Sequence, residues 1–151
     1  MPLTEKRIAE DLTRAMKARD MPLVYVLRGV VAALKNLKVE KRVDALPEAD
    51  IVQVVRRELR QREEAEEFAR RAGRDDLVAQ NEAERGILEP YLPAVLSDGE
   101  LEARIREIAT GSADPSLGVI MGTLRAELAG RYDGRRASEI AKLVLSERGD
   151  G

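Results

Sequence analysis

The chain of 151 residues contains no cysteine and no histidine, and only 3% of its residues are aromatic. Without cysteine there is no disulfide framework, no thiolate nucleophile and no cysteine-ligated zinc. Without histidine, serine-type catalytic triads and HExxH metal sites are excluded. We therefore expect no catalytic residue, no metal site and no cofactor in this chain.

Long hydrophobic runs are also lacking. No apolar stretch approaches the roughly 20 residues that a membrane-spanning helix needs. The first residues, MPLTEKRIAEDL, contain no apolar signal core. These absences predict a protein without a membrane association and with a cytoplasmic location.

The residues that are present favour an ordered helical protein. Apolar residues make up 44% of the chain and charged residues 36%, with 26 Lys and Arg nearly balancing 28 Asp and Glu. Disordered chains usually combine a large net charge with few aliphatic residues, so this composition indicates a core of Leu, Val, Ile and Ala.

Helix start and stop signals recur along the sequence. Thr4 can cap a first helix, Asp20 and Pro22 begin a second, Pro47 suits the first turn of a third, and Gly73 can end it. We predict helices over residues 4–19, 22–41, 47–72, 75–88, 98–109, 114–129 and 133–147, with Asp75 capping the fourth and Asp114 and Pro115 starting the sixth. The second, which is apolar from Leu23 to Leu34, should be the most buried. No alternating run suggests a strand, so the predicted fold class is all-α.

The composition changes at the segment EPYLPAVLSDGE, which has two prolines and a glycine between helical patterns. Ser97 and Glu100 within it have the spacing of a capping box, in which each side chain satisfies a backbone N–H of the other residue. We predict a domain of longer helices over residues 1–92 and a small three-helix domain over residues 97–148.

A densely charged segment, residues 56–76, carries 14 charges in 21 residues. Its glutamates at 63, 64, 66 and 67 raise the possibility of a di-metal carboxylate site. That chemistry uses Glu-x-x-His pairs on facing helices, and the chain has no histidine. We interpret the segment as a solvated helix with ion pairs to Arg60, Arg70 and Arg71 at spacings of three or four residues.

Several phrases, in order along the chain, resemble the YqeY family of small bacterial proteins, also called GatB/YqeY-domain proteins. They are LRGVVAALKNLKVEK, RRELRQREEAEEFARRAGRDDL, AERGILEPYLP, LGVIMGTL and AGRYDGRRASEIAKLVL. The resemblance implies an all-helical fold with a larger N-terminal domain and a three-helix C-terminal domain. The latter is similar to the tail of the B subunit of glutamine-dependent aspartyl/glutamyl-tRNA amidotransferase, a tRNA-contacting module.

What the resemblance implies for activity differs from what the residues allow. The shared tail implies a glutamine-dependent carbon–nitrogen ligase at the level of the family. Releasing ammonia from glutamine needs an activated nucleophile, typically Cys or a Ser with a Lys relay, and carboxylate activation needs a nucleotide-binding loop. The chain has no Cys and no Walker-type loop, so we expect no intrinsic activity. The expected partners are tRNA, the amidotransferase or another translation-related protein.

The stretch AGRYDG, residues 129–134, allows two interpretations. In the first it is only a turn, with Gly130 ending the sixth helix and Asp133 and Gly134 beginning the seventh. In the second, Arg131, Tyr132, Arg135 and Arg136 gather at a helix N-terminus and contact RNA phosphates and an unstacked base.

Two features limit the second interpretation. Members of the family often read KGRADG here, whereas this chain has Ala129 and Tyr132, and Val119 replaces a frequent lysine. From residue 97 onward there are 8 Lys and Arg against 10 Asp and Glu. Any RNA contact should therefore be local and weak. The alternative function is a protein-interaction module that uses the charged third helix or a crevice between the domains.

Overall fold

The computed structural model describes residues 2–128 and 130–149. Within these ranges the secondary structure consists of seven α-helices and one short 3₁₀ helix, without a strand. The all-α prediction is therefore confirmed. The chain divides into two compact units, Met1–Leu92 and Pro93–Gly151, called here the N-terminal and C-terminal units.

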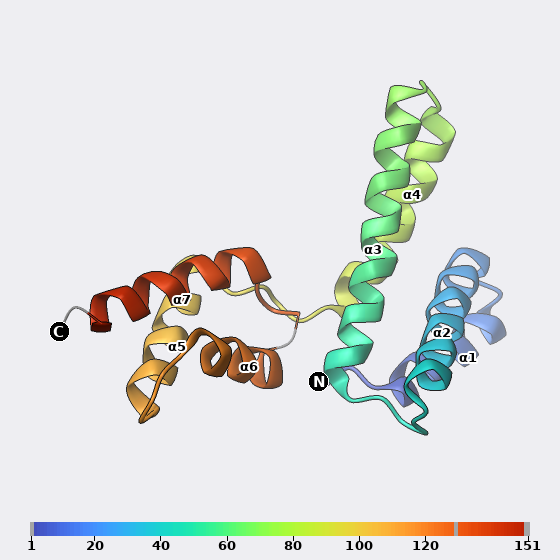
Figure 1. Cartoon of the computed structure of the whole chain (residues 1–151). Coiled ribbons are helices and arrows are strands. Elements are labelled where there is room, and N and C mark those ends of the chain that lie inside the picture. Colours follow the sequence, from blue (N-terminus) through green and yellow to red (C-terminus); the bar gives the residue numbers. More distant parts are fainter. Residues whose placement is uncertain (1, 129, 150–151) are drawn as a thin grey trace. The chain divides into compact units, whose positions relative to one another are not determined.

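The N-terminal unit contains α1 (Glu5–Ala18), α2 (Met21–Lys41), α3 (Glu48–Arg71), α4 (Asp75–Leu88) and the 3₁₀ helix η1 (Glu89–Tyr91). Helices α3 and α4 run side by side as a long hairpin, and α1 pairs with α2 (Figure 1). Helix α2 joins the two pairs because it packs on both α3 and α4.

Most helix boundaries in this unit follow the predicted signals. The side chain of Thr4 accepts a hydrogen bond from the Arg7 N–H at 3.1 Å, and Asp20 accepts one from the Leu23 N–H at 3.4 Å. Gly73 has a φ of 70° after α3. The prediction that Asp75 caps α4 was wrong, because Asp75 is the first helical residue and Arg74 takes the cap position, without a capping hydrogen bond from a backbone N–H to its side chain.

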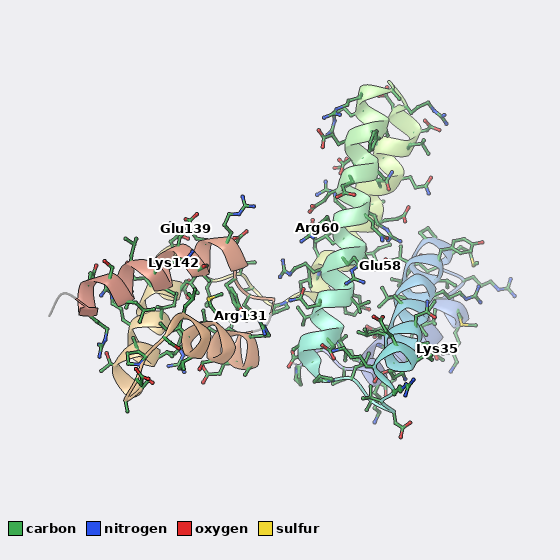
Figure 2. The ribbon with its side chains drawn as sticks, viewed as in Figure 1. Lys35, Glu58, Arg60, Arg131, Glu139 and Lys142 are labelled. Atoms are coloured by element: carbon green, nitrogen blue, oxygen red, sulfur yellow. The ribbon has the colours of Figure 1, made fainter. Side chains whose placement is uncertain are left out.

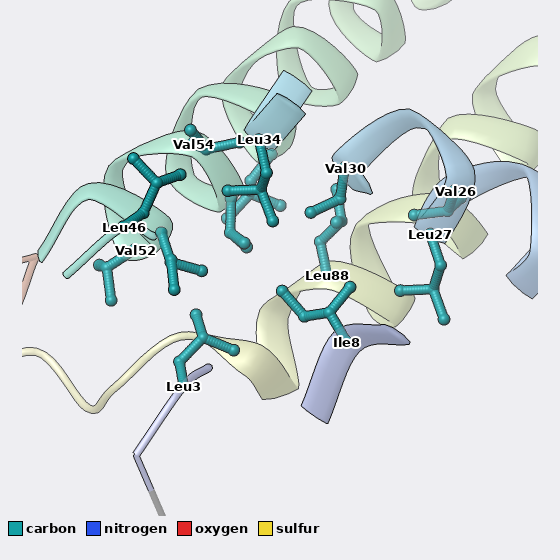
Figure 3. Packing of buried hydrophobic residues seen from close by; sticks show 13 residues of the cluster. Leu3, Ile8, Val26, Leu27, Val30, Leu34, Leu46, Val52, Val54 and Leu88 are labelled. Atoms are coloured by element: carbon teal, nitrogen blue, oxygen red, sulfur yellow. The ribbon is translucent and has the colours of Figure 1, made fainter. Parts of the chain in front are cut away.

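The core of the N-terminal unit comes from all four α-helices (Figure 3). Helix α3 contributes five residues to this core and α2 four, so the expectation that the second helix is the most buried was wrong. The first turns of α3 carry Ile51, Val52, Val54 and Val55, which fill the space between the helix pairs. Leu88, at the end of α4, is fully buried.

The C-terminal unit is a three-helix bundle of α5 (Asp98–Gly111), α6 (Leu117–Glu127) and α7 (Gly134–Gly149). The capping box at its start is present: Ser97 Oγ accepts from the Glu100 N–H, and the Glu100 carboxylate accepts from the Ser97 N–H, both at 3.1 Å. Helix α6 begins later than predicted because Ser116, and not Asp114 or Pro115, caps it, accepting from the Val119 N–H at 3.2 Å.

The core of this unit is entirely apolar. Its buried members are Leu101, Ile105, Ile108, Ala109, Ile120, Leu124, Ala137, Ile140, Ala141 and Val144. Each unit thus has a hydrophobic core of its own, built from its own helices.

No helix within the described residues is both long and apolar enough to cross a membrane.

Candidate nucleic-acid interface

The turn between α6 and α7 is built by local backbone requirements. Gly130 is buried and has a φ of 76°, a conformation that costs little only for glycine. The Asp133 carboxylate accepts a hydrogen bond from the Arg136 N–H at 2.8 Å, and α7 begins at Gly134. Ala129, the predicted last residue of α6, lies outside the described residues; α6 itself ends at Glu127.

The linker that precedes α5 is tied to this turn by two hydrogen bonds. The Leu96 N–H donates to the carbonyl of Arg131 at 2.7 Å, and Arg131 Nε donates to the carbonyl of Ala94 at 3.0 Å. The half-buried Arg131 side chain, labelled in Figure 2, is therefore positioned by a neutral acceptor. A carbonyl does not neutralise a guanidinium, so Arg131 retains its full positive charge.

Tyr132 is half-buried and packs against the core of the C-terminal unit. Burial raises the pKa of its phenol, and the nearby Arg125 guanidinium offsets part of that effect. Tyr132 therefore serves the core first, and only the remaining exposed part of its ring is available for stacking on a base.

The two arginines at the start of α7 differ in their surroundings. Arg136 pairs with Asp98 and with Glu139, each at 3.0 Å, and the hydrogen bonds to Glu139 and Asp98 raise its pKa. Arg135 is exposed and, within residues 2–128 and 130–149, has neither a hydrogen bond nor an ion pair from its side chain. Arg135 is therefore the more accessible cation for an external anion.

Arg125, in the last turn of α6, lies close enough to Tyr132 to influence its pKa. Sequence reasoning missed it because it stands ten positions before Arg135 in the chain. We define the cationic tip as Arg125, Arg131, Tyr132 and Arg135. None of its three arginines forms an ion pair with a carboxylate of the described residues, whereas Arg136 does.

The charged segment of α3 has one feature that the sequence did not reveal. Glu67 pairs with Arg71 at the surface, as expected of a solvated helix. Glu66, in contrast, is buried, with Arg70 of its own helix at 3.1 Å and Arg85 of α4 at 2.7 Å. Within the described ranges, no three acidic side chains are grouped in a way that could hold a metal ion.

The sequence of this chain is similar to three curated proteins named "Altered inheritance of mitochondria protein 41, mitochondrial". The identity is 32% over 115 residues for Kluyveromyces lactis, covering 73% of this chain and 62% of the relative. It is 30% over 99 residues for Eremothecium gossypii, covering 64% and 54%, and 28% over 114 residues for Lachancea thermotolerans, covering 73% and 61%. The chain thus spans between about half and three fifths of these relatives.

A sequence model of the family described as "Yqey-like protein" matches residues 5–145, which include all four helices of the N-terminal unit and most of the C-terminal bundle. The resemblance noted in the sequence is therefore confirmed, and the chain belongs to the Yqey-like protein family.

Proposed function

We propose that this protein is a non-catalytic helical module whose C-terminal unit binds RNA weakly through the cationic tip, with tRNA as the ligand. The observation that carries the proposal is that Arg125 lies near Tyr132, with Arg131 and Arg135 within three residues of Tyr132 in the chain. None of the three arginines forms an ion pair among the described residues, although the pKa of the Glu100 carboxyl is lowered by its capping-box hydrogen bonds and, to a lesser extent, by the nearby Arg131. Unpaired guanidinium groups beside an aromatic ring are suited to phosphates and an unstacked base. The choice of tRNA rests on the family resemblance of the C-terminal helices.

The expected affinity is modest. Three phosphate contacts on single-stranded RNA correspond to a slope of about −2 for log affinity against log salt concentration, at about 0.7 per contact. The C-terminal part of the chain has two more acidic than basic residues, so the tip lacks the wide basic surface of a dedicated RNA-binding domain.

The proposal assigns no chemistry to this chain. The sequence lacks a cysteine that would serve as the nucleophile and a histidine that would activate one. We propose that any amidotransferase connection is that of a binding partner. Translation takes place both in the cytoplasm and in mitochondria. A role with tRNA is thus compatible with our cytoplasmic expectation and with the word "mitochondrial" in the relatives' names.

The test is a tRNA titration followed by fluorescence anisotropy at several salt concentrations. The double variant Arg125→Ala/Arg135→Ala removes two of the three contacts and should reduce the slope to about −0.7. Arg131 is left in place in this variant because its side chain also holds the linker. The matched control is Lys142→Ala/Arg148→Ala, which removes two charges from α7 away from the tip (Figure 2 labels Lys142).

A second control separates charge from folding. Asp133→Ala removes the cap of α7 and should lower the free energy of unfolding by about 1 kcal/mol while leaving the arginines in place. If the variant Arg125→Ala/Arg135→Ala binds tRNA with the affinity and salt slope of the unmodified protein, the cationic tip is not the contact and the proposal fails.

A second candidate function is protein interaction without RNA. The charged α3 is a weak basis for it, since Glu66, Glu67, Arg70 and Arg71 are already joined in ion pairs. The exposed face of α2 is a better basis for a protein interaction than α3.

A further inference from the structure

An exposed stripe runs along the whole of α2. It consists of Met21, Tyr25, Arg28, Ala32, Lys35 and Val39, all of them exposed. The spacings of four and three residues alternate, which is the spacing of one helix face and of a coiled-coil seam. We call this set the α2 stripe; at 1.5 Å per residue it is about 27 Å long.

The stripe separates into two columns of side chains, each with a repeat of seven residues. Tyr25, Ala32 and Val39 form an apolar column, with Tyr25 65% and Val39 78% exposed. Met21, Arg28 and Lys35 form the other column, with an apolar residue followed by two cations. Large apolar side chains at this exposure on a regular helical repeat are suited to receiving a second helix.

The charge of the stripe is of one sign. No Asp or Glu occurs between Asp20 and Glu40, although 28 of the 151 residues are acidic. The other lysines of α2 are engaged, Lys38 with Glu5 and Lys41 with Asp50, each at 2.8 Å. Arg28 and Lys35, in contrast, have no ion pair within the part of the chain that the structure describes.

The surface beside the stripe supplies room for a partner without supplying counter-charges. An apolar groove of about 480 Å³ lies between the start of α2 and α4, lined by Met21, Pro22, Tyr25, Gln80, Ala83, Glu84 and Ile87. Glu84, the acidic residue of this groove, is 3.4 Å from Arg62. The glutamate of this groove is therefore paired within the protein, and not with Arg28 or Lys35.

A second groove, of about 390 Å³, lies between α2 and α3. Glu58 points from α3 toward α2 (Figure 2). A Cβ atom added at Gly29 would lie 3.3 Å from Glu58 Oε1. Glu58 is paired with Arg62 at 3.4 Å. Arg57 also lines this groove and, like Arg28, has no ion pair among the described residues. Glu40, which also lines this groove, has no ion pair among the described residues either, so the unpaired charges of this groove balance and those of the stripe itself are positive.

We propose that the α2 stripe is the docking surface for an acidic amphipathic helix of a partner protein. The apolar face of that helix covers Tyr25, Ala32 and Val39, and its carboxylates, seven residues apart, meet Arg28 and Lys35. This interaction is separate from the RNA contact, which lies in the other unit.

A pair of designed peptides tests the proposal. Both are three-heptad helices with leucine at the seam; one carries glutamate beside the seam and the other carries lysine at the same positions. The full chain should bind the glutamate peptide at least about tenfold more tightly than the lysine peptide, because like charges face each other in the second complex. Tyr25→Ala should weaken the binding of the glutamate peptide by about thirtyfold, as expected for the loss of an aromatic anchor.

Charge reversal provides the decisive readout. The variant Arg28→Glu/Lys35→Glu should lose the glutamate peptide and gain the lysine peptide, which loss of folding would not produce. The matched control, Lys142→Glu/Arg148→Glu, changes the net charge equally and should retain the original preference. Circular dichroism verifies that each variant is helical.

Other occupants of the stripe would overturn the proposal. Three other interactions are measured: binding of a 20-nucleotide single-stranded RNA, sedimentation with vesicles of phosphatidylserine and phosphatidylcholine, and dimerisation detected by light scattering. If charge reversal of the stripe abolishes any of these, the stripe serves that occupant and the proposal is wrong. Failure of both peptides to bind, or binding that Tyr25→Ala and charge reversal leave unchanged, overturns it as well. The tRNA proposal is judged separately, by the variants of the cationic tip in the C-terminal unit.

Discussion

The two units handle charge in different ways. Ion pairs connect different helices in both units, but they differ in exposure. Among the described residues of the C-terminal unit, each side chain in an ion pair is at least 34% exposed, over a core of apolar residues. In the N-terminal unit several ion pairs between helices reach inward: Glu66 with Arg85, Glu5 with Lys38, and Arg62 with Glu84.

This difference suggests that the two units fix the alignment of their helices in different ways. Partly buried ion pairs between helices favour one alignment over others, because a shift along the axis would leave a charge without a partner. An apolar core with capped helices relies on packing and on helix ends. Breaking one interaction of each kind should therefore have consequences of different size, and the following variants test this.

The largest effects should come from core truncations, one in each unit. Leu88→Ala and Ile105→Ala both remove methyl groups from side chains with no exposed surface. Each should lower the free energy of unfolding of its own unit by about 3 kcal/mol. Methyl NMR signals followed through a denaturant titration report the two units separately. If both variants shift one common transition equally, the units are not independent in stability.

A smaller effect is expected from the buried charge of α3. Glu66→Ala removes the buried carboxylate partner of Arg85, which keeps only the exposed Glu89 at 3.4 Å, and should lower the stability of the N-terminal unit by about 2 kcal/mol. This is less than for a fully buried pair because Arg70 remains 65% exposed.

The adjacent Glu67→Ala is the matched control for this variant. Glu67 pairs with Arg71 at the surface, so its loss should cost at most about 0.5 kcal/mol. Urea denaturation followed by circular dichroism measures both. Equal effects of the two variants would mean that burial gives Glu66 no special role.

The smallest effect concerns pH. The hydrogen bond from Lys38 lowers the pKa of Glu5 below its ordinary value of 4.5, although burial acts in the opposite direction. The Glu5 carboxylate therefore stabilises the fold above its ordinary pKa, and this contribution is lost as the pH falls through the lower folded value. Glu5→Gln should reduce stability by about 1 kcal/mol or less at pH 7.

The difference between Glu5→Gln and the unmodified protein should begin to narrow as the pH falls through the usual glutamate range and should vanish once the pH is below the lowered folded pKa of Glu5. In the C-terminal unit, Glu147→Gln is the comparison, since Arg106 lowers the pKa of Glu147 at an exposed site. Its effect should disappear in high salt, where surface charges are screened. A difference in stability for Glu5→Gln that does not narrow as the pH falls would show that the role of Glu5 is not that of a carboxylate.

The sequence predicts the helices well wherever a boundary depends on local chemistry. Thr4, Asp20 and the pair Ser97–Glu100 act as caps because the accepting side chain and the N–H it satisfies lie within three residues. The same reasoning failed at α6, where three neighbouring residues could all begin a helix and Ser116 takes the position. Arg19 and Arg42, with φ of 55° and 57°, end α1 and α2 without the glycine that sequence reasoning looks for.

The candidate sites were harder to predict because they depend on contacts between distant segments. The burial of Glu66 requires α4 to bring Arg85 against it, and four glutamates in one charged run do not indicate which of them faces inward. Arg125 reaches the cationic tip only after α6 has packed against the turn at Tyr132. The exposed side of α2 is visible only once the other side is known to be buried.

The place of Leu88 in the core has a consequence for synthesis on the ribosome. Leu88 lies against Ile8 and Val30, so residues from both ends of the N-terminal unit are packed together (Figure 3), and Tyr91 next to it donates a hydrogen bond to Asp11. The apolar stretch that ends at Leu34 therefore emerges about 50 residues before the segment that completes its cover. At about 5–20 residues per second, nascent α1 and α2 expose their inner faces for several seconds. During that interval the half-made unit presents apolar surface that the finished unit buries.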